Sequence, residues 1–194
     1  IIGTVAGCSG VKRDTVDLFP RPDIYFVSAP SCEGSSTNFS SSQYSSTFIP
    51  TWTWDFGDPA SGAANIENGV VVTHNFETAG NYAVTLFGTD INGCADTVVQ
   101  TIEVKPSPAA QFEVEEACVG DFVNFTNTST VAAPNSILSY LWQFGDGNTS
   151  GQTDPAKAYI LAGTYSVTLT ANGNNGCSGS TTVPVKVHAY PTPG

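Results

Sequence analysis

The feature that most constrains this chain is an internal repeat. The segment Cys32-Glu33-Gly34 returns 86 residues later as Cys118-Val119-Gly120, and other motifs return at nearly the same spacing. A fixed period is the signature of repeated domains rather than of one large body. We therefore predict two complete copies, at residues 21–106 and 107–189. The flanking segments are expected to be the last strand of a preceding copy (1–20) and the start of a following one (190–194).

The pattern within each copy predicts short β-strands. Tyr82, Val84 and Leu86 alternate with small or polar residues, the period of two that is typical of a strand with one buried face. Asn92-Gly93 and Asp146-Gly147 are tight-turn dipeptides between such runs. With about seven strands in each copy, the predicted fold class is all-β, as two seven-stranded sandwiches.

Composition excludes two classes of partner. The formal net charge is −11, and charged residues make up only 12% of the chain. An acidic surface repels phosphate backbones and anionic lipids, because binding to them depends on Lys and Arg. No apolar run approaches the roughly 20 residues needed to cross a bilayer. We expect no nucleic-acid partner and no membrane insertion.

Two motifs resemble the signature of PKD domains. They are Trp54-Asp55-Phe56-Gly57-Asp58 and Trp142-Gln143-Phe144-Gly145-Asp146-Gly147, each followed by an aromatic residue and then by Gly-x-Tyr-x-Val-Thr-Leu. The resemblance implies immunoglobulin-like, extracellular sandwiches without catalytic residues. Two positions depart from the pattern, because Gln143 replaces the first Asp and Pro59 replaces the Gly after the second.

These motifs also supply the expected core. Aromatic residues two apart on a strand point to one face, and each Trp carries an N–H that needs a partner when buried. The Asp that follows each Gly is expected to turn the chain by holding backbone N–H groups. The predicted core motif consists of Trp54, Phe56, Asp58, Tyr82, Trp142, Phe144, Asp146 and Tyr165.

The five cysteines are expected to form disulfides rather than a metal site, because no Cys-x-x-Cys pair or His cluster accompanies them. In a seven-stranded sandwich every connection reverses direction. The first connection, which holds Cys32, and the sixth, which holds Cys94, therefore lie at opposite ends. A strand of about seven residues spans about 23 Å, whereas a disulfide tolerates Cα atoms up to about 7 Å apart. A bridge within one domain cannot close.

The same parity predicts a disulfide between domains. The chain leaves the first domain at the end that carries Cys32 and enters the second at the end that carries Cys177. We predict a Cys32–Cys177 bridge, with Cys8, Cys94 and Cys118 pairing outside this segment; unpaired thiols are the alternative. The linkers Pro20-Arg21-Pro22 and Pro106-Ser107-Pro108 are too short and constrained to act as flexible tethers, so we expect end-to-end stacking.

Other candidate sites are weaker. Carboxylates near turns could bind Ca²⁺, but no dense Asp-x-Asp-x-Asp loop is present, so no metal or cofactor is expected. His74 and His188 are isolated in the sequence, and no Gly-x-Ser-x-Gly motif accompanies the serines, which argues against catalysis. The Ca²⁺ candidates are Asp55, Asp58, Asp90, Asp96 and Asp146.

Two surface features remain. Asp14-Thr15-Val16 and Asp96-Thr97-Val98 resemble the tripeptide that is O-glycosylated in Bacteroidota secretory proteins, which makes Thr15 and Thr97 candidate glycan sites; chance matches in Thr-rich strands are the alternative. Trp52 and its counterpart Tyr140 are the candidate contacts for a carbohydrate, an interpretation that weakens if both rings are buried.

The Cys-x-Gly and Asn-Gly-Cys motifs of each copy resemble the long repeat proteins of Bacteroidota, which include gliding-motility adhesins and other cargo of the type IX secretion system. The leading hypothesis is a non-catalytic, structural or adhesive segment of an extracellular surface protein. Its expected partners are neighbouring repeats, other copies in a filament and surface polysaccharide. The alternative is a polysaccharide-binding or spacer region of a secreted hydrolase.

Overall fold

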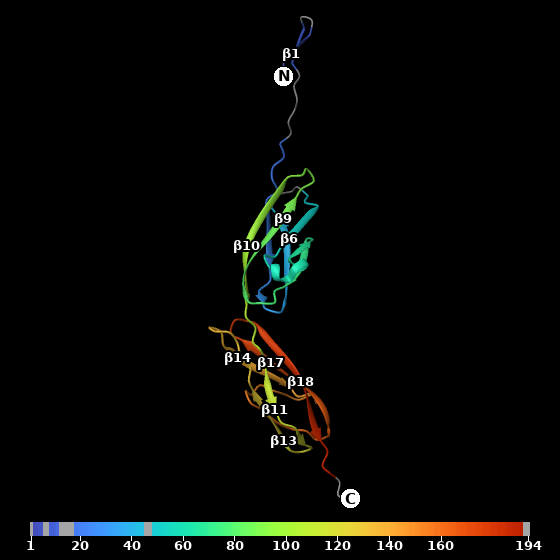
Figure 1. The fold of residues 1–194 in the computed structure, drawn as a ribbon, viewed down its shortest axis with the longest axis vertical. Coiled ribbons are helices and arrows are strands. Elements are labelled where there is room, and N and C mark those ends of the chain that lie inside the picture. The colour runs from blue at the N-terminus through green and yellow to red at the C-terminus, as the bar shows by residue number, and fades with distance from the viewer. Residues whose placement is uncertain (1, 6–7, 12–17, 45–47, 192–194) are drawn as a thin grey trace.

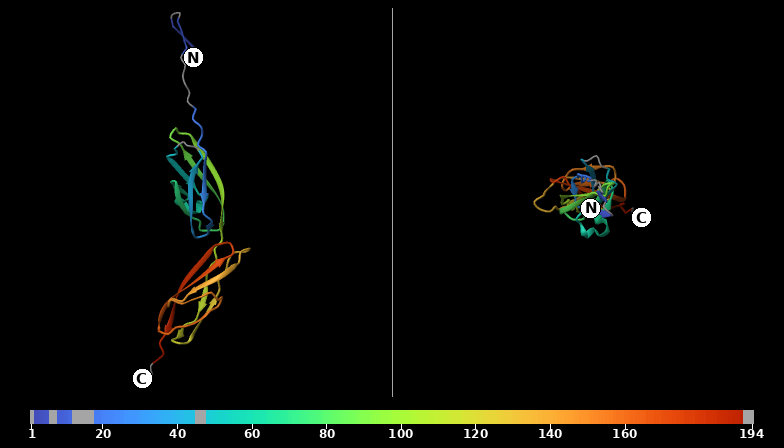
Figure 2. Two further views of the ribbon diagram at one scale, coloured as in Figure 1. Left: turned by 180° about the vertical axis from the view of Figure 1, so that it is seen from behind. Right: turned by 90° about the horizontal axis from the view of Figure 1, so that it is seen from above.

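The computed structural model describes residues 2–5, 8–11, 18–44 and 48–191. The molecule is a rod in which two β-sandwich domains follow one another along the long axis (Figures 1 and 2). No helix among the described residues is long and apolar enough to cross a membrane. The predicted all-β class, as two tandem sandwiches, is confirmed.

The first domain consists of a three-stranded and a five-stranded sheet. The smaller sheet has the order β3 (Ile24–Ser28), β5 (Ser36–Gln43) and β8 (Val71–Asn75). The larger sheet has the order β4 (Ser31–Cys32), β10 (Ala95–Lys105), β9 (Gly80–Thr89), β6 (Thr51–Asp55) and β7 (Ile66–Asn68). A short 3₁₀ segment, η1 (Pro59–Asn65), connects β6 to β7.

The second domain repeats this topology strand for strand. Its smaller sheet has the order β11 (Phe112–Val114), β13 (Phe122–Asn127) and β16 (Ala156–Ala158). Its larger sheet has the order β12 (Ala117–Cys118), β18 (Ser178–His188), β17 (Gly163–Gly173), β14 (Ile137–Gln143) and β15 (Thr149–Ser150).

The first strand of each domain is divided between its two sheets. β3 pairs antiparallel with β5, and the chain then crosses to the larger sheet, where β4 pairs in parallel with β10. β11 and β12 make the same crossing. Each domain therefore has the predicted seven strands, with the first strand in two parts. Because Lys105 pairs with Cys32, the last strand leaves the domain beside that cysteine.

The N-terminal segment is described only in part. The structure shows β1 (Ile2–Val5) and β2 (Cys8–Val11) paired as an antiparallel hairpin, and the assignment of residues 1–20 to the last strand of a preceding copy stays a prediction. Pairing satisfies backbone groups that a lone strand would leave without partners. The predicted start of a following copy is described only as far as residue 191 and stays a prediction.

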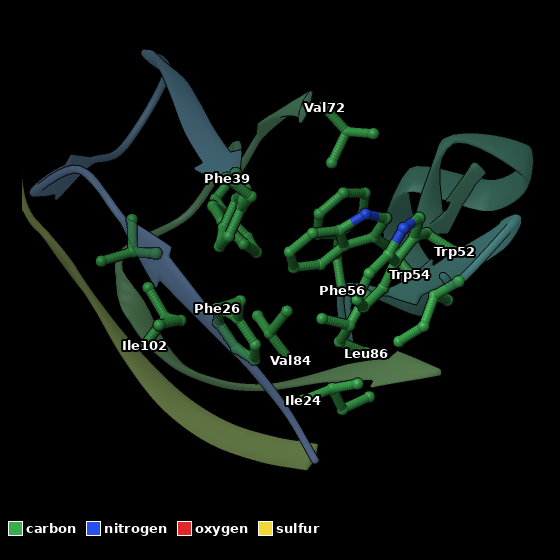
Figure 3. Close-up of a cluster of buried hydrophobic side chains, with 13 residues drawn as sticks. Ile24, Phe26, Phe39, Trp52, Trp54, Phe56, Val72, Val84, Leu86 and Ile102 are labelled. Atoms are coloured by element: carbon green, nitrogen blue, oxygen red, sulfur yellow. The ribbon is translucent and has the colours of Figure 1, made fainter. Parts of the chain in front are cut away.

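Aromatic residues fill the space between the sheets of each domain, and Figure 3 shows those of the first. Trp54 and Trp142 are fully buried. Their indole N–H groups donate to the carbonyl oxygens of Gly69 and Gln152, each at 2.9 Å, so neither ring leaves a buried donor unpaired. Replacing a buried Trp by Ala costs about 3–5 kcal/mol, so these rings contribute a large part of each domain's stability.

The glycine of each motif is required by a close backbone approach. Gly57 and Gly145 have φ of +65° and +77°. A Cβ atom there would lie 2.6 Å from the Ala83 carbonyl oxygen and 2.8 Å from that of Ser166. The motif turn therefore rests directly on the neighbouring strand, β9 or β17.

The tyrosines of the motif are half-buried and fix the preceding turn. The Tyr82 hydroxyl donates to the Thr78 carbonyl oxygen at 2.8 Å, and the Tyr165 hydroxyl donates to that of Leu161 at 2.9 Å. Both rings also pack against the core of their own domain. This is the tyrosine corner that is typical of immunoglobulin-like sandwiches.

The two motif aspartates behave differently. Asp146 accepts the N–H of Asn148 at 3.0 Å, which is the predicted turn contact. The prediction is wrong for Asp58, whose carboxylate lies 3.0 Å from Nε2 of His74. Asp55 accepts the N–H of Gly57 instead, at 2.9 Å. The reason is that Pro59 begins η1, which directs the chain away and leaves Asp58 facing inward.

The joint between the domains as candidate functional site

The domains meet at a disulfide between Cys32, at the end of β4, and Cys177, in the turn between β17 and β18. The two Cα atoms lie 5.8 Å apart, and the bond joins residues separated by 145 positions in the sequence. This is the pair expected from strand parity. In the chain-entropy model a disulfide that closes a loop of that length contributes about 4–5 kcal/mol to the stability of the folded state.

Glu33 fixes the linker to the first domain. Its carboxylate accepts the N–H of Ser107 at 2.9 Å and the N–H of Ala79 at 3.0 Å. The Ser107 hydroxyl donates back to the Glu33 carbonyl oxygen at 3.1 Å. Hydrogen bonds to a charged acceptor are stronger than neutral ones, so the linker is held against the corner that carries the disulfide.

Asn175 fixes the same linker to the second domain. Its side-chain amide donates to the Pro106 carbonyl oxygen at 2.8 Å, and its Oδ1 accepts the N–H of Cys177 at 3.1 Å. Lys105 reaches across from the first domain and donates to the Asn175 carbonyl oxygen at 3.3 Å. One turn therefore carries both the disulfide and the linker contacts.

One glycine allows the linker to approach the second domain. Pro108 is buried beside the turn that holds Cys177, and a Cβ atom at Gly179 would collide with the Pro108 carbonyl oxygen. A Cβ atom at Gly173 would instead lie 2.8 Å from Asn175 Oδ1, within that turn. The joint thus combines a covalent bond, hydrogen bonds and close backbone packing, which leaves little freedom for hinge motion.

The sequence did not single out these polar residues. A signal was available in the differences between the repeats, because the residue equivalent to Glu33 in the second copy is Val119. Likewise the residues equivalent to Gly173 and Gly179 in the first copy are Asp90 and Asp96. Positions that differ between otherwise matching copies mark the places where the two domains have different neighbours.

An ion pair lies beside the motif turn of the second domain. Lys157 Nζ lies 2.8 Å from the Asp146 carboxylate. Burial acts to raise the pKa of Asp146, but hydrogen bonds from Lys157 and Asn148 outweigh it and lower the pKa to about 2. Burial, together with the nearby Asp146 charge, raises the pKa of Tyr159 to about 12.

The two histidines are not isolated, contrary to the expectation. His74 is buried, and its ring stacks on Phe56 with centroids 4.2 Å apart while Nε2 meets Asp58. His188 contacts the Glu116 carboxylate. Both partners come from distant parts of the sequence, which no local spacing indicates.

The predicted carbohydrate contact at Trp52 is wrong. Its side chain is 8% exposed and belongs to the core, beside Trp54 in Figure 3. Gly88 makes the room for it, because a Cβ atom there would lie 3.2 Å from the indole ring. Tyr140 is half-buried and packs against the second core. The Trp52 ring is therefore not available to a sugar, whereas the contact at Tyr140 stays a prediction.

The remaining candidates have these positions. Thr97 is exposed on β10, whereas Thr15 lies outside the described residues. Among the described residues no group of three His, Cys, Asp or Glu side chains could hold a metal ion. Asp90 accepts the N–H groups of Asn92 and Cys94, and Asp96 pairs with Arg21 at 2.7 Å.

The family model for the PKD domain matches residues 20–106 and, a second time, residues 104–188. The chain belongs to the PKD domain family. PKD domains are non-catalytic, immunoglobulin-like modules, so the two sandwiches are not an enzyme.

Two curated relatives contain such PKD segments. A pre-pro-metalloprotease, PrtV, of Vibrio cholerae is 42% identical over 81 residues, which is 42% of this chain and 8% of that protein. A microbial collagenase of Vibrio alginolyticus is 37% identical over 71 residues, which is 37% of this chain and 9% of that protein. The chain therefore spans less than a tenth of the length of these relatives.

A solved structure is similar as well. The crystal structure of the PKD1 domain from the Vibrio cholerae metalloprotease PrtV is 41% identical and covers 42% of this chain and 96% of its own, with a TM-score of 0.38. The PKD1 domain of Vibrio anguillarum Epp is 32% identical and covers 43% of this chain and 96% of its own, with a TM-score of 0.40.

Proposed function

We propose that the two PKD domains are a rigid, non-catalytic spacer of an extracellular protein. The observation that best supports this proposal is the joint between the domains. There the Cys32–Cys177 disulfide and the contacts of Glu33 and Asn175 fix one sandwich on the next. A stiff joint converts two small domains into one rod. The rod keeps whatever lies at its two ends at a set distance and orientation.

The relatives support a hydrolase as the parent protein. A metalloprotease and a collagenase each devote a small share of their length to a matching segment. A disulfide of this kind persists in oxidising, extracellular surroundings. In a hydrolase, the rod would place a catalytic part at a fixed reach from a substrate or surface.

The adhesive hypothesis stays a prediction from the sequence. It includes a gliding or attachment adhesin, export by the type IX system, filament formation and contact with surface polysaccharide. The burial of Trp52 removes the aromatic ring on which the polysaccharide contact depended. Thr97 remains a proposed site of O-glycosylation, because its side chain is exposed on β10.

The spacer proposal is tested by residual dipolar couplings of the oxidised protein. We expect one alignment tensor to fit both domains. The variant with Cys32→Ser and Cys177→Ser should require a separate tensor for each domain, or show reduced couplings in one of them. The matched control carries Cys94→Ser and Cys118→Ser, which lie outside the joint, and should behave as the parent. Two unrelated tensors in the oxidised parent protein would overturn the proposal.

A further inference from the structure

The lower end of the second domain has the same geometry as the lower end of the first, which forms the joint. Cys118 pairs with His188 in a parallel ladder, as Cys32 pairs with Lys105. The N–H of Val119 donates to the His188 carbonyl oxygen at 2.9 Å, which is the distance of the matching contact in the first domain. Cys118 is thus held where Cys32 is held, but it carries a free thiol.

The corner that follows Cys118 is also the same. The N–H of Gly120 donates to the Tyr159 carbonyl oxygen at 2.9 Å, and the N–H of Gly34 donates to that of Phe76 at 2.8 Å. Because each corner is tied to its own core, the position of the cysteine is a property of the domain. It does not depend on the disulfide.

The upper end of the first domain repeats the upper end of the second. Cys94 Sγ lies 4.0 Å from the Phe19 carbonyl oxygen, and Cys177 Sγ lies 3.9 Å from that of Lys105. Phe19 occupies the linker position of Lys105, 86 residues earlier. Cys94 therefore sits against its linker as Cys177 does when it is bonded.

We propose that Cys94 and Cys118 are the two open halves of further joints of this kind. Cys94 would bond to the cysteine at the lower corner of a PKD domain on its N-terminal side. Cys118 would bond to the cysteine in the upper turn of a PKD domain on its C-terminal side. The inference rests on the proposed spacer function and names the partner that extends the rod: another sandwich of the same family in the same chain.

The chemistry of closure balances with a disulfide oxidant. Two thiols form one S–S bond and give up two electrons and two protons. Oxidised glutathione takes them up and leaves as two reduced thiols, through a mixed disulfide on one of the two cysteines. Both Cys94 and Cys118 are partly exposed, so the reagent can reach them.

The outer joints differ from the inner one in their polar contacts. Val119 cannot replace the carboxylate of Glu33, so the lower corner of the second domain lacks that hold on the linker. At the upper end of the first domain Arg21 instead donates to Asp96 at 2.7 Å and to the Ala95 carbonyl oxygen at 3.2 Å. Each outer joint thus has polar contacts of its own, and the lower one has the Tyr190 hydroxyl, which donates to the Asp121 carboxylate at 2.9 Å.

A duplicated protein tests the inference. Residues 20–188 are followed directly by a second copy of residues 20–188, so that His188 precedes Pro20 as Lys105 precedes Pro106. After equilibration with oxidised and reduced glutathione, the monomeric fraction is alkylated, digested without reduction and mapped by mass spectrometry. We expect a peptide that joins Cys118 of the first copy to Cys94 of the second.

Two controls make the result decisive. Cys118→Ser in the first copy should leave Cys94 of the second copy alkylated and every other disulfide unchanged. Six Gly and Ser residues inserted between His188 and Pro20 should lower the effective concentration of the two thiols for each other about tenfold or more. If Cys118 of the first copy and Cys94 of the second are both alkylated while the Cys32–Cys177 bonds are intact, this inference is overturned and the spacer proposal stands. Loss of the Cys32–Cys177 bond would instead overturn the spacer proposal.

Discussion

The Glu33 carboxylate accepts the N–H of Ser107 at 2.9 Å and so ties the corner of the first domain to the linker that leads to the second. The same carboxylate accepts the N–H of Ala79, which belongs to the turn before β9. One side chain therefore links the corner, a neighbouring turn and the linker. The corresponding residue of the second domain is Val119, so the chain itself contains the comparison that isolates its effect.

Glu33→Val should loosen the joint without unfolding either domain. Each net hydrogen bond to a charged group contributes about 1.5–3 kcal/mol when buried and less at partly exposed sites such as these. We expect amide hydrogen exchange of Ser107 to accelerate about tenfold or more, which corresponds to about 1.4 kcal/mol. The control is Glu103→Val, an exposed change on β10 that should leave the exchange of Ser107 as it was. Unchanged exchange in Glu33→Val would contradict the assignment.

Gly145→Ala should destabilise the second domain far more than Gly147→Ala. Both glycines have positive φ, of +77° and +89°, which costs a substituted residue about 1–2 kcal/mol. Only at Gly145 would the new Cβ atom also meet a backbone atom, the Ser166 carbonyl oxygen at 2.8 Å, whereas Gly147 faces open space. We expect a loss of about 3 kcal/mol or more against about 1 kcal/mol, measured by urea unfolding. Equal losses would show that the close approach is unimportant.

The second domain should lose stability in acid through Asp146. Its folded-state pKa of about 2 lies below the unfolded value near 4, so its contribution is present above pH 4 and disappears as the pH falls toward 2. The side chain is 20% exposed, so we expect a contribution of only about 1–2 kcal/mol. Asp146→Asn should flatten the pH dependence of unfolding in that window. A slope that survives this change would have to come from other carboxylates.

Removing the residue that pairs with the motif aspartate should destabilise the first domain more than the second. His74 and Asp58 have side chains only 2% and 8% exposed, whereas Lys157 and Asp146 are each 20% exposed. His74→Leu leaves a buried carboxylate unpaired, and we expect a loss of about 3 kcal/mol. Lys157→Leu should cost about 1 kcal/mol, because water reaches Asp146. Thermal unfolding of the two variants checks the order, and the reverse order would contradict this reading of the burial.

Much of the fold follows from linear features of the sequence. The repeat fixes the number of domains, and the alternation around Tyr82 and Leu86 predicts strands with one buried face. Trp54 and Trp142 are core residues in both the sequence pattern and the structure. The Cys32–Cys177 pair follows from counting strand reversals, because each reversal moves the chain to the opposite end of the sandwich.

The side-chain partners did not follow in this way. Trp52 lies two residues before Trp54 and shares its face, but only the structure shows that Gly88 on the neighbouring strand opens room for it in the core. Asp58 and His74 meet across 16 residues, and Glu33 and Ser107 across 74. Asp58, Glu33 and Ser107 lie outside the strands, and no local period records where such segments end.

Two tandem β-sandwiches with aromatic cores can be predicted from the residues alone, because apolar side chains recur with a period of two along each strand. The way in which the sandwiches are held together depends on their folded arrangement. Hydrogen bonds act over about 3 Å, and the donors and acceptors of the joint reach that separation only after both domains have folded and the linker lies between them.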